Sequence, residues 1–305
     1  MIRPSAQGAG ELLVGGVPGS SNAKRQRGVL EETGHRPWPI PDAPWLMGQT
    51  WIDLLFAHWR VDPKLLQAVM PPQLSPQTFD GSAWLGVTPF VVQGLRLRGT
   101  WPMPFLSRFP EINVRTYVSV GEKPGIYFFS LDAHSRSAVF AARRSYRLPY
   151  FRSEIDVTAE GEAVHYRARR VSGDGPAAEF QATYSPVGEA QPAKPGTLAH
   201  WLTERYCLYT LDDAERICRA DIHHPPWPLQ PARAEIELNT MTAGVGLSLE
   251  EEPLLHYSGR QDVVLWTIEP TDGSRSGTRS LPPLRQRLPR KPSKADAAAD
   301  PHPES

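Results

Sequence analysis

A chain of 305 residues, 40% hydrophobic and 22% charged, can bury a sizeable core as one large domain or as two smaller ones. Its 33 basic and 33 acidic residues balance, so no overall field attracts nucleic acid or an anionic membrane, and we expect neither as a partner. Two cysteines are too few for a disulfide-stapled secreted domain, and no apolar run is long enough for a signal peptide or a membrane helix, so we expect a cytoplasmic protein.

Both ends of the chain have the composition of disordered segments. Residues 1–40 are rich in Gly, Pro, Ser, Arg and Gln without a periodic apolar pattern, and residues 271–305 are similar. Neither segment can bury enough apolar surface to offset the entropy lost on ordering. We therefore predict a disordered tail over 1–40, a single β domain over 41–270 and a second disordered tail over 271–305. A basic run from Arg285 to Lys294 in the second tail is expected to be solvated.

The first expected elements of the domain are a buried strand and a short helix. Residues 51–60 contain only three polar side chains, which predicts a strand buried on both faces. Asp62 is suited to cap the following helix, with Pro63 in its first turn, where a missing N–H costs nothing. The pair Pro71-Pro72 ends that helix.

Two of the polar side chains in the first strand are Asp53 and His58. Because their numbers differ by an odd amount, they point to opposite faces and are not expected to form a catalytic dyad. A buried carboxylate must be paired or hydrogen-bonded, so we expect Asp53 to have an arginine or backbone partner.

The clearest strand is residues 111–120, which alternates strictly between two faces. One face is apolar apart from a threonine: Ile112, Val114, Thr116, Val118 and Val120. The other face is largely polar: Glu111, Asn113, Arg115, Tyr117 and Ser119. A turn over 121–125 then leads to a returning strand over 126–131.

The rest of the domain is expected to contain short strands and few helices. Helices are predicted over 134–146 and near 197–204. Strands are predicted over 150–158, 162–171, 178–184, 205–211, 216–223, 232–240 and 262–268. Many antiparallel strands at short spacing favour a mainly β (α+β) barrel or sandwich.

Several sequence segments, taken in order, carry a family resemblance. They include Pro-Trp-Leu-Met at 44–47, Asp-Leu-Leu-Phe-Ala-His-Trp at 53–59 and Pro-Glu-Ile-Asn-Val-Arg-Thr-Tyr-Val at 110–118. Further segments lie at 146–151, 205–209 and 223–231. Over about residues 44–268 the chain resembles the YqjF-like family of bacterial proteins of unknown function. That family is similar to the acetoacetate decarboxylase-like superfamily, which implies an antiparallel β-barrel or cone around a small-molecule cavity.

The resemblance also implies where a catalytic lysine would stand, and this chain departs from the pattern. Tyr150 and Phe151 occupy the place where the decarboxylase keeps paired lysines. The six lysines of the chain lie in the tails, in the first turn of a helix or beside Pro-Gly turns: Lys24, Lys64, Lys123, Lys194, Lys291 and Lys294. Imine chemistry needs a lysine in a desolvated pocket, so we expect no Schiff base.

Glu111, Asn113 and Arg115 are the leading candidates for a binding site. Inside a cavity the arginine could clamp a carboxylate at two points, and the glutamate could transfer a proton if burial raised its pKa. Composition alone favours a solvent-facing strand instead, whereas the resemblance places Glu111 in the pocket. A buried Arg115 is expected to pair with Glu111 or with another acid of the pocket.

Other candidates are histidines and tyrosines. Of the adjacent His223 and His224, at most one can enter a given pocket, and we assign His224 as a possible acid or base. Tyr150 and Tyr206 are assigned as substrate-binding phenols, with buried core tyrosines as the alternative. No metal-ligand, phosphate-loop or dinucleotide motif occurs in the sequence, so we expect no metal and no cofactor.

The two cysteines, Cys207 and Cys218, would face each other if Asp212-Asp213 formed a two-residue hairpin turn. In a reducing compartment we expect buried thiols rather than a disulfide.

Two functions remain open at this point. One is an enzyme acting on a small carboxylate or keto acid by acid–base chemistry without a lysine imine, with a lyase- or hydro-lyase-like activity. The other is a non-catalytic small-molecule binding or sensor protein with the same cavity. A homo-oligomer is possible in either case.

Overall fold

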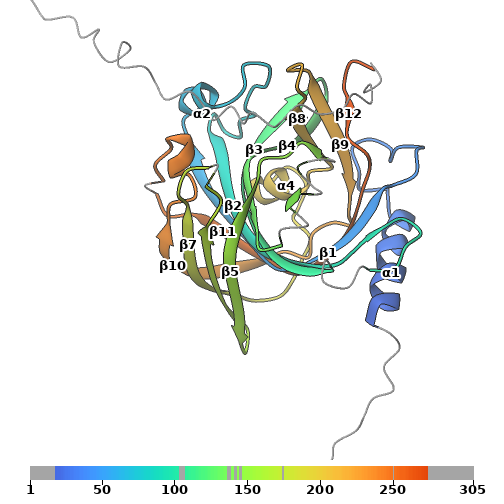
Figure 1. Ribbon diagram of the computed structural model, residues 1–305, viewed down its shortest axis with the longest axis horizontal. Coiled ribbons are helices and arrows are strands. Elements are labelled where there is room, and N and C mark those ends of the chain that lie inside the picture. The colour runs from blue at the N-terminus through green and yellow to red at the C-terminus, as the bar shows by residue number, and fades with distance from the viewer. Residues whose placement is uncertain are drawn as a thin grey trace, which may run out of the picture.

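The computed structural model describes residues 18–102, 107–135, 139, 140, 143, 146–173, 175–249 and 251–273. These residues form a mainly β structure with a few short helices (Figure 1). The helices are α1 (Pro18–Gly28), α2 (Pro63–Val69) and α4 (Leu198–Thr203), with 3-10 turns at Val29–Glu31 and Ala243–Val245. The longer strands are β1 (Met47–Val61), β2 (Ala83–Leu97), β3 (Arg108–Val120), β4 (Lys123–Ala133), β5 (Tyr150–Glu160), β10 (Gln230–Asn239) and β11 (Leu254–Leu265). The shorter ones are β6 (Ala163–Arg170), β7 (Glu179–Pro186), β8 (Cys207–Leu211), β9 (Ile217–His223) and β12 (Glu269–Pro270).

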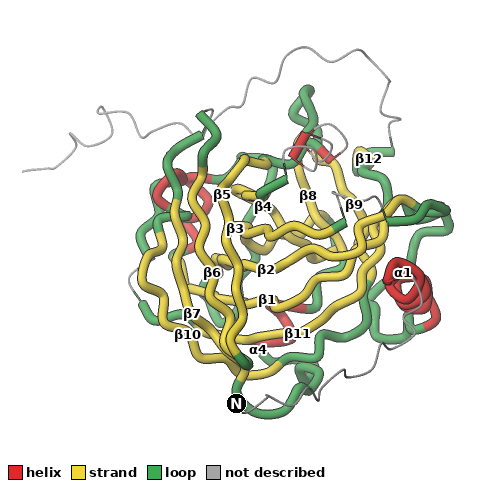
Figure 2. The backbone as a smooth tube through the Cα atoms, turned by 60° about the horizontal axis from the view of Figure 1, so that its bottom comes forward, coloured by secondary structure: helices red, strands yellow, loops and turns green. Residues whose placement is uncertain are grey.

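The strands of this part of the chain belong to one sheet that closes on itself twice. Strands β1 to β4 and β11 continue on one side through β10, β7, β6 and β5, and a pairing of β4 with β5 closes a nine-strand ring. On the other side they continue through β8 and β9, and a pairing of β9 with β11 closes a seven-strand ring. The four strands that belong only to the nine-strand ring lie together at one side of the shared strands (Figure 2). The expected barrel is confirmed.

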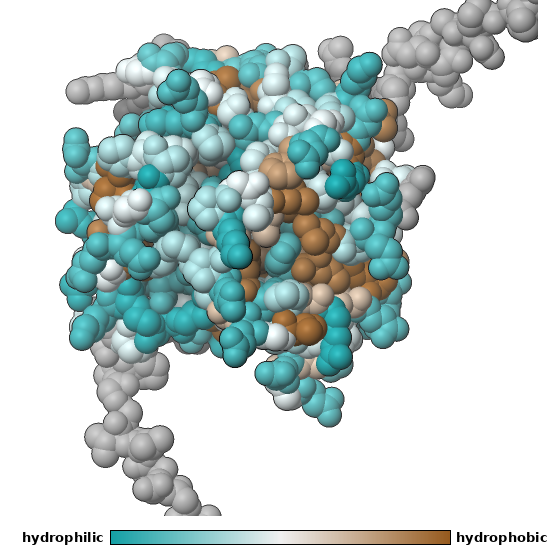
Figure 3. All heavy atoms as spheres, turned by 180° about the vertical axis from the view of Figure 1, so that it is seen from behind, coloured by the Kyte–Doolittle hydropathy of each residue, from teal (hydrophilic) through white to brown (hydrophobic). Residues whose placement is uncertain are grey.

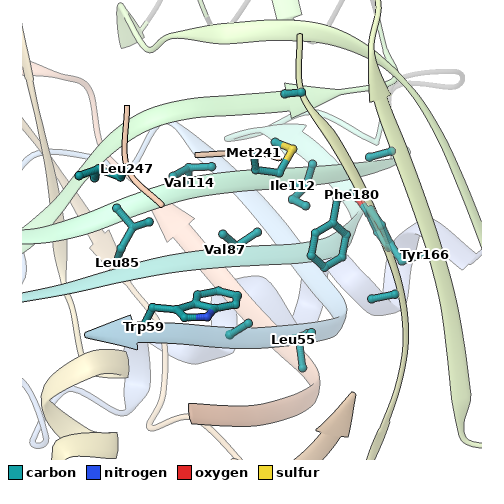
Figure 4. Packing of buried hydrophobic residues seen from close by; sticks show 14 of the residues in the cluster. Leu55, Trp59, Leu85, Val87, Ile112, Val114, Tyr166, Phe180, Met241 and Leu247 are labelled. Carbon is teal, nitrogen blue, oxygen red and sulfur yellow. The ribbon is translucent and has the colours of Figure 1, made fainter. Parts of the chain in front are cut away.

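The two faces of β3 serve the two rings. The apolar face packs into the solid core of the nine-strand ring, where Ile112 and Val114 lie in one cluster with Tyr166 and Phe180 (Figure 4). The opposite face, which begins at Glu111, points into the seven-strand ring. The alternation predicted from the sequence is therefore confirmed, and it places the polar face inside the molecule rather than in solvent.

The expected helix start is also confirmed. The side chain of Asp62 accepts a hydrogen bond from the backbone N–H of Lys64, and Pro63 is the first helical residue. The helix ends before Pro71, as predicted.

The N-terminal boundary at residue 40 is wrong. Helix α1 packs against the barrel at β1, β2 and β11. Gln26 is fully buried and donates to Thr50 Oγ1 and to the carbonyl of Gly94, at 3.2 and 3.0 Å. Its own amide oxygen accepts from Arg96 at 2.8 Å. A polar, Gly-rich composition hid this helix because hydrogen bonds, rather than an apolar stripe, hold it to the barrel. Residues 1–17 and 274–305 lie outside the described residues.

Three further differences concern strands and a helix. The sequence predicts no strand over the residues of β2, because Gly86, Pro89 and Gly94 interrupt the apolar pattern there. Pro89 lies opposite a bulge in β1, where a missing N–H is tolerated. Strand β11 begins at Leu254 and ends at Leu265, so the strand expected over 262–268 is misplaced. In the expected helix over 134–146 the described positions 139, 140, 143 and 146 are helical, and most of the others lie outside the described residues.

The hairpin that carries the cysteines has a longer turn than expected. Thr210 pairs with Cys218, and Cys207 pairs with Asp221, so the two cysteines do not face each other. Both are buried free thiols, as predicted.

Seen from behind, most of the surface is hydrophilic, with hydrophobic residues gathered in one area of that face (Figure 3).

Candidate functional site

The seven-strand ring encloses a cavity with a volume of about 310 Å³. Side chains from the shared strands, from β8 and β9, and from the end of α4 line it. In the projection of Figure 1, α4 is seen through the middle of the ring, and Figure 2 shows it near β11. The lining is mainly apolar and includes Trp51, Leu54, Phe56, Phe90, Phe109, Ile126, Phe128, Leu131, Leu148, Leu202, Leu208 and Trp227. Mostly apolar walls with a few placed polar groups are typical of small-molecule sites.

The polar face of β3 supplies three of those polar groups. Glu111, Asn113 and Arg115 all line the cavity and are 5%, 3% and 5% exposed, respectively. The structure thus brings together the three residues that the sequence singled out. Strand geometry places them in a row, with about 7 Å between one and the next.

Glu111 forms the acidic end of the row. The hydroxyl of Tyr150 donates to Glu111 Oε2 at 3.0 Å. Burial raises the pKa of Glu111 to about 8, although the hydrogen bond from Tyr150 lowers it and Asp132 adds to the rise. Burial also raises the pKa of Tyr150 well above its ordinary value, so the phenol keeps its proton and acts as a donor. At neutral pH this end of the cavity is therefore a protonated carboxyl beside a phenol.

Arg115 forms the other end of the row, and its expected pairing with Glu111 is wrong. No carboxylate of the described residues lies within 4.0 Å of its guanidinium group, and its Nε is buried without a hydrogen-bond partner. The guanidinium carbon lies 5.1 Å from the centre of the Phe56 ring. Glu111 is four residues away, so the Cα atoms of the two residues are about 13 Å apart along an extended strand. The carboxyl group of Glu111 is instead hydrogen-bonded to the hydroxyl of Tyr150.

Arg205, which follows α4, is a cavity residue that the sequence analysis did not single out. It is 3% exposed and lines the cavity. Its Nε donates to the carbonyl of Trp201 at 2.6 Å and its Nη1 to Gln77 Oε1 at 2.5 Å, while its Nη2 is buried without a partner. Burial lowers its pKa to about 10, so it stays charged at neutral pH. The only sequence signal was that it is the one charged residue of the predicted strand 205–211.

Behind the two arginines lies a buried neutral pair. Nε2 of His58 and the hydroxyl of Tyr117 form a hydrogen bond of 2.6 Å. Burial lowers the pKa of His58 well below its ordinary value, and the charges of Arg115 and Arg205 lower it further, so its imidazole is neutral.

Asp53 is separate from that pair, as expected. It sits at a bulge of β1 with a φ of 53°, and its carboxylate accepts from the hydroxyl of Tyr257 at 2.8 Å. The expected arginine or backbone partner is thus a phenol instead.

The histidine pair divides between two sides of β9. His224 lines the cavity, whereas the Nε2 of His223 lies 2.8 Å from the carbonyl of Val29 in the N-terminal segment. In His224 the ring nitrogens lie 2.8 and 3.3 Å from the carbonyls of Pro225 and Arg205. Burial lowers the pKa of His224, so it is neutral at pH 7. A neutral imidazole carries one N–H, so only one of the two carbonyls accepts from it, and Nδ1 also lies 3.3 Å from the amide nitrogen of Gln261. These contacts favour a role in shaping the cavity wall.

Tyr206 is not among the residues that line the cavity. Its ring stacks on His224 with 4.8 Å between centroids, its hydroxyl donates to Glu204, and the guanidinium of Arg36 lies 4.7 Å from its ring centre. It lies behind the cavity wall because it neighbours Arg205 in the chain and points the other way. Of the two expected phenols, only Tyr150 lines the cavity.

None of the lysines in the described part of the chain lines the cavity, and Tyr150 and Phe151 begin β5. No group of three or more His, Cys, Asp or Glu side chains among the described residues is arranged to hold a metal ion. No helix in that part of the chain is long and apolar enough to cross a membrane.

Comparison with protein families identifies the chain. A family model described as DUF2071, uncharacterized conserved protein, matches residues 48–262. The chain belongs to this family. It is also 46% identical, over 230 residues, to the uncharacterized protein YqjF of Bacillus subtilis. The aligned residues cover 75% of this chain and 94% of that protein.

Solved structures with a similar fold are acetoacetate decarboxylase-like. The enduracididine biosynthesis enzyme MppR is 11% identical with a TM-score of 0.54, over 76% of this chain and 90% of that one. An acetoacetate decarboxylase-like enzyme from Sphingomonas wittichii is 14% identical with a TM-score of 0.51, over 78% and 98%. At these identities the likeness shows the fold alone, which is the fold expected from the sequence.

Proposed function

We propose that the cavity binds a small organic carboxylate at Arg115 and that Glu111 transfers a proton to or from the bound molecule. The observation that carries the proposal is a guanidinium group buried at the wall of an apolar cavity, with no carboxylate of the described residues within 4.0 Å of it. A buried charge without a counter-ion is costly, and a ligand carboxylate would supply the missing partner through two parallel hydrogen bonds.

The protonated carboxyl of Glu111 supports the catalytic half of the proposal. A general acid works best when its pKa lies near the working pH, and burial has moved this one to about 8. It could protonate a carbonyl or carbanion centre and, once ionised, remove a proton. None of the lysines in the described part of the chain lines the cavity, so the proposed proton transfer does not use an imine. A solved MppR structure, similar in fold, is complexed with the condensation product of pyruvate and imidazole 4-carboxaldehyde.

A thermal-shift and calorimetric screen against small carboxylic and keto acids tests the proposal, because a ligand that binds only the folded state raises the melting temperature. Arg115→Lys should weaken binding, since a point charge cannot reproduce the planar two-point contact, and Arg115→Met should abolish it. Arg98→Met, at an exposed arginine in the turn after β2, is the control and should bind normally. Equal binding by Arg115→Met and the unaltered protein would reject the proposal.

A non-catalytic binding or sensor protein is the second candidate. It is favoured by His224, whose ring nitrogens lie within hydrogen-bond distance of main-chain carbonyls and of the Gln261 amide. Product formation from a bound acid, followed by NMR and lost in Glu111→Gln, distinguishes an enzyme from a binder. The cytoplasmic location and a homo-oligomeric state stay predictions.

A further inference from the structure

Two arginines, rather than one, stand at the same end of the cavity. The guanidinium carbon of Arg205 lies 4.9 Å from the ring centre of Tyr117, which is two residues beyond Arg115 on the same face of β3. The charges of both arginines lower the pKa of Tyr117 against the effect of burial, so both lie close to its hydroxyl.

Neither arginine has an acidic neighbour. No described carboxylate lies within 4.0 Å of Arg115 or Arg205, and each has a buried nitrogen without a hydrogen-bond partner. Two like charges buried side by side repel each other, and a single anion placed between them would stabilise both.

The acidic end lies far from this pair. Glu111 and Arg115 are separated by about 13 Å along the strand. With carbon–carbon bonds of about 1.5 Å, acetate or pyruvate held by the arginines spans well under half of that distance. Apolar side chains line the wall along the whole row: Phe90 pairs with Glu111, Leu131 pairs with Asn113, and Phe56 lies beside Arg115. Asn113 interrupts it midway, with a buried amide oxygen that has no partner.

We infer that the ligand is an elongated, mainly apolar carboxylic acid whose carboxylate is held jointly by Arg115 and Arg205. Its chain extends along the aromatic wall, and a hydroxyl remote from the carboxylate donates to the amide oxygen of Asn113 near Glu111. This inference rests on the proposed function and names the substrate class.

Calorimetry with the linear acids acetate, butanoate, hexanoate, octanoate and decanoate tests the length. Affinity should rise about fourfold for each added methylene, the equivalent of about 0.8 kcal/mol per buried CH₂, until the chain fills the cavity. Acetate and pyruvate that bind as tightly as octanoate would overturn the inference on length, while leaving the proposed carboxylate site in place. Failure of every acid to bind would reject the proposed function itself.

The joint role of the arginines needs a ligand comparison within one variant. Arg205→Gln should weaken octanoate binding at least tenfold and leave binding of the matched alcohol, octanol, within about twofold. Arg205→Lys keeps the charge, so its affinity for octanoate should lie between those of the unaltered protein and Arg205→Gln. It is the second variant to use if circular dichroism shows that Arg205→Gln is unfolded. Arg98→Gln is the matched control at an exposed position. Equal losses for the acid and the alcohol in Arg205→Gln would show that Arg205 only supports the wall.

Discussion

Glu111 makes the stability of the molecule depend on pH in a direction unusual for a carboxylic acid. Burial raises its pKa from 4.5 in the ordinary case to about 8, so the folded state keeps a proton that the unfolded chain releases. Between these two values the unfolded state binds fewer protons, and stability therefore falls as the pH rises.

We expect the free energy of unfolding to decrease between pH 5 and pH 8 by a few kcal/mol through this group. Glu111→Gln keeps the shape and the neutral charge but cannot release a proton, so it should lack this part of the decrease. Urea denaturation at pH 5, 6.5 and 8 measures the difference. An equally steep decrease in the variant would mean that Glu111 is ionised in the folded state at neutral pH.

Arg115 and Arg170 are both buried arginines, and they should respond to mutation in opposite ways. Arg170 makes two hydrogen bonds to the carboxylate of Asp132, at 2.7 and 2.6 Å, whereas Arg115 has no carboxylate partner in the described structure. Arg170→Met leaves a buried carboxylate unpaired and should destabilise the fold by about 3–5 kcal/mol.

Arg115→Met removes an uncompensated buried charge, so it should be neutral or stabilise the fold by about 1–3 kcal/mol while abolishing carboxylate binding. Urea denaturation of both variants, with ligand titration of Arg115→Met, makes the comparison. A loss of several kcal/mol in Arg115→Met would point to a counter-ion for this residue in the folded protein. Binding sites often lower the stability of the folded protein, because the groups that bind a ligand are not the ones that would stabilise the fold most.

At the scale of elements, the N-terminal helix depends on a missing side chain in the barrel. A Cβ added at Gly48 would lie 2.6 Å from Gln26 Oε1 and 3.1 Å from its Cδ. Gly48→Ala should therefore displace the Gln26 side chain and break its hydrogen bonds to Thr50 and Arg96. We expect this to lower the free energy of unfolding by about 1–3 kcal/mol. Hydrogen exchange in residues 18–28 should accelerate.

Gly34→Ala is the matched control, since nothing lies within 4 Å of a Cβ there. Unchanged exchange of α1 in Gly48→Ala would mean that the helix is held to the barrel by other contacts. Truncation to residue 40 should likewise destabilise the fold more than truncation to residue 17, because it removes Gln26 and the carbonyl of Val29 that meets His223.

Elements with a strict period were predictable from the sequence, and elements that depend on tertiary contacts were not. The alternation of β3 and the cap of α2 are local patterns, and both proved correct. Strand β2 was hidden because its glycines and proline fit only their tertiary neighbours: Pro89 lies opposite a bulge of β1, and a Cβ at Gly86 would lie 3.1 Å from the His58 ring. Helix α1 has no apolar face, so its polar sequence gave no sign of docking.

The candidate site was predictable for the same reason and to the same extent. Alternation put the three residues on one face of β3, and the family resemblance placed that face in the pocket. Neighbours in space come from the register between strands, which no local pattern encodes. Tyr206 was predicted to line the cavity, but its neighbour Arg205 does so instead. Adjacent residues face opposite ways, and only the closed ring decides which of them faces inward. The predicted pairing of Arg115 with Glu111 is wrong because four residues of extended strand place their backbones about 13 Å apart.

At the scale of the whole molecule, the two rings separate stability from binding along each shared strand. Val114 is fully buried in the solid core of the nine-strand ring, and Asn113 faces the cavity. Val114→Ala should lower the free energy of unfolding by about 2–3 kcal/mol and leave ligand affinity within about twofold.

Asn113→Ala should do the reverse, with little effect on unfolding and a loss of affinity for acids that carry a hydroxyl group able to donate to the amide oxygen. Denaturation and calorimetry on the same two variants test the separation. A loss of affinity in Val114→Ala as large as that in Asn113→Ala would show that the solid ring controls the shape of the cavity.

Five strands shared between a solid ring and a hollow one also affect how such proteins can diverge. On each shared strand, alternate positions are under different selective pressures. Residues that face the solid ring are selected for folding, and residues that face the cavity are selected for binding of the ligand. A lineage can thus drift through new ligands by substitutions at every second residue without repeatedly crossing states that fail to fold. Descendants of one ancestor should differ more at positions 111, 113 and 115 than at 112 and 114. Ligand preference would then be the quickly evolving trait, carried on an architecture that changes slowly.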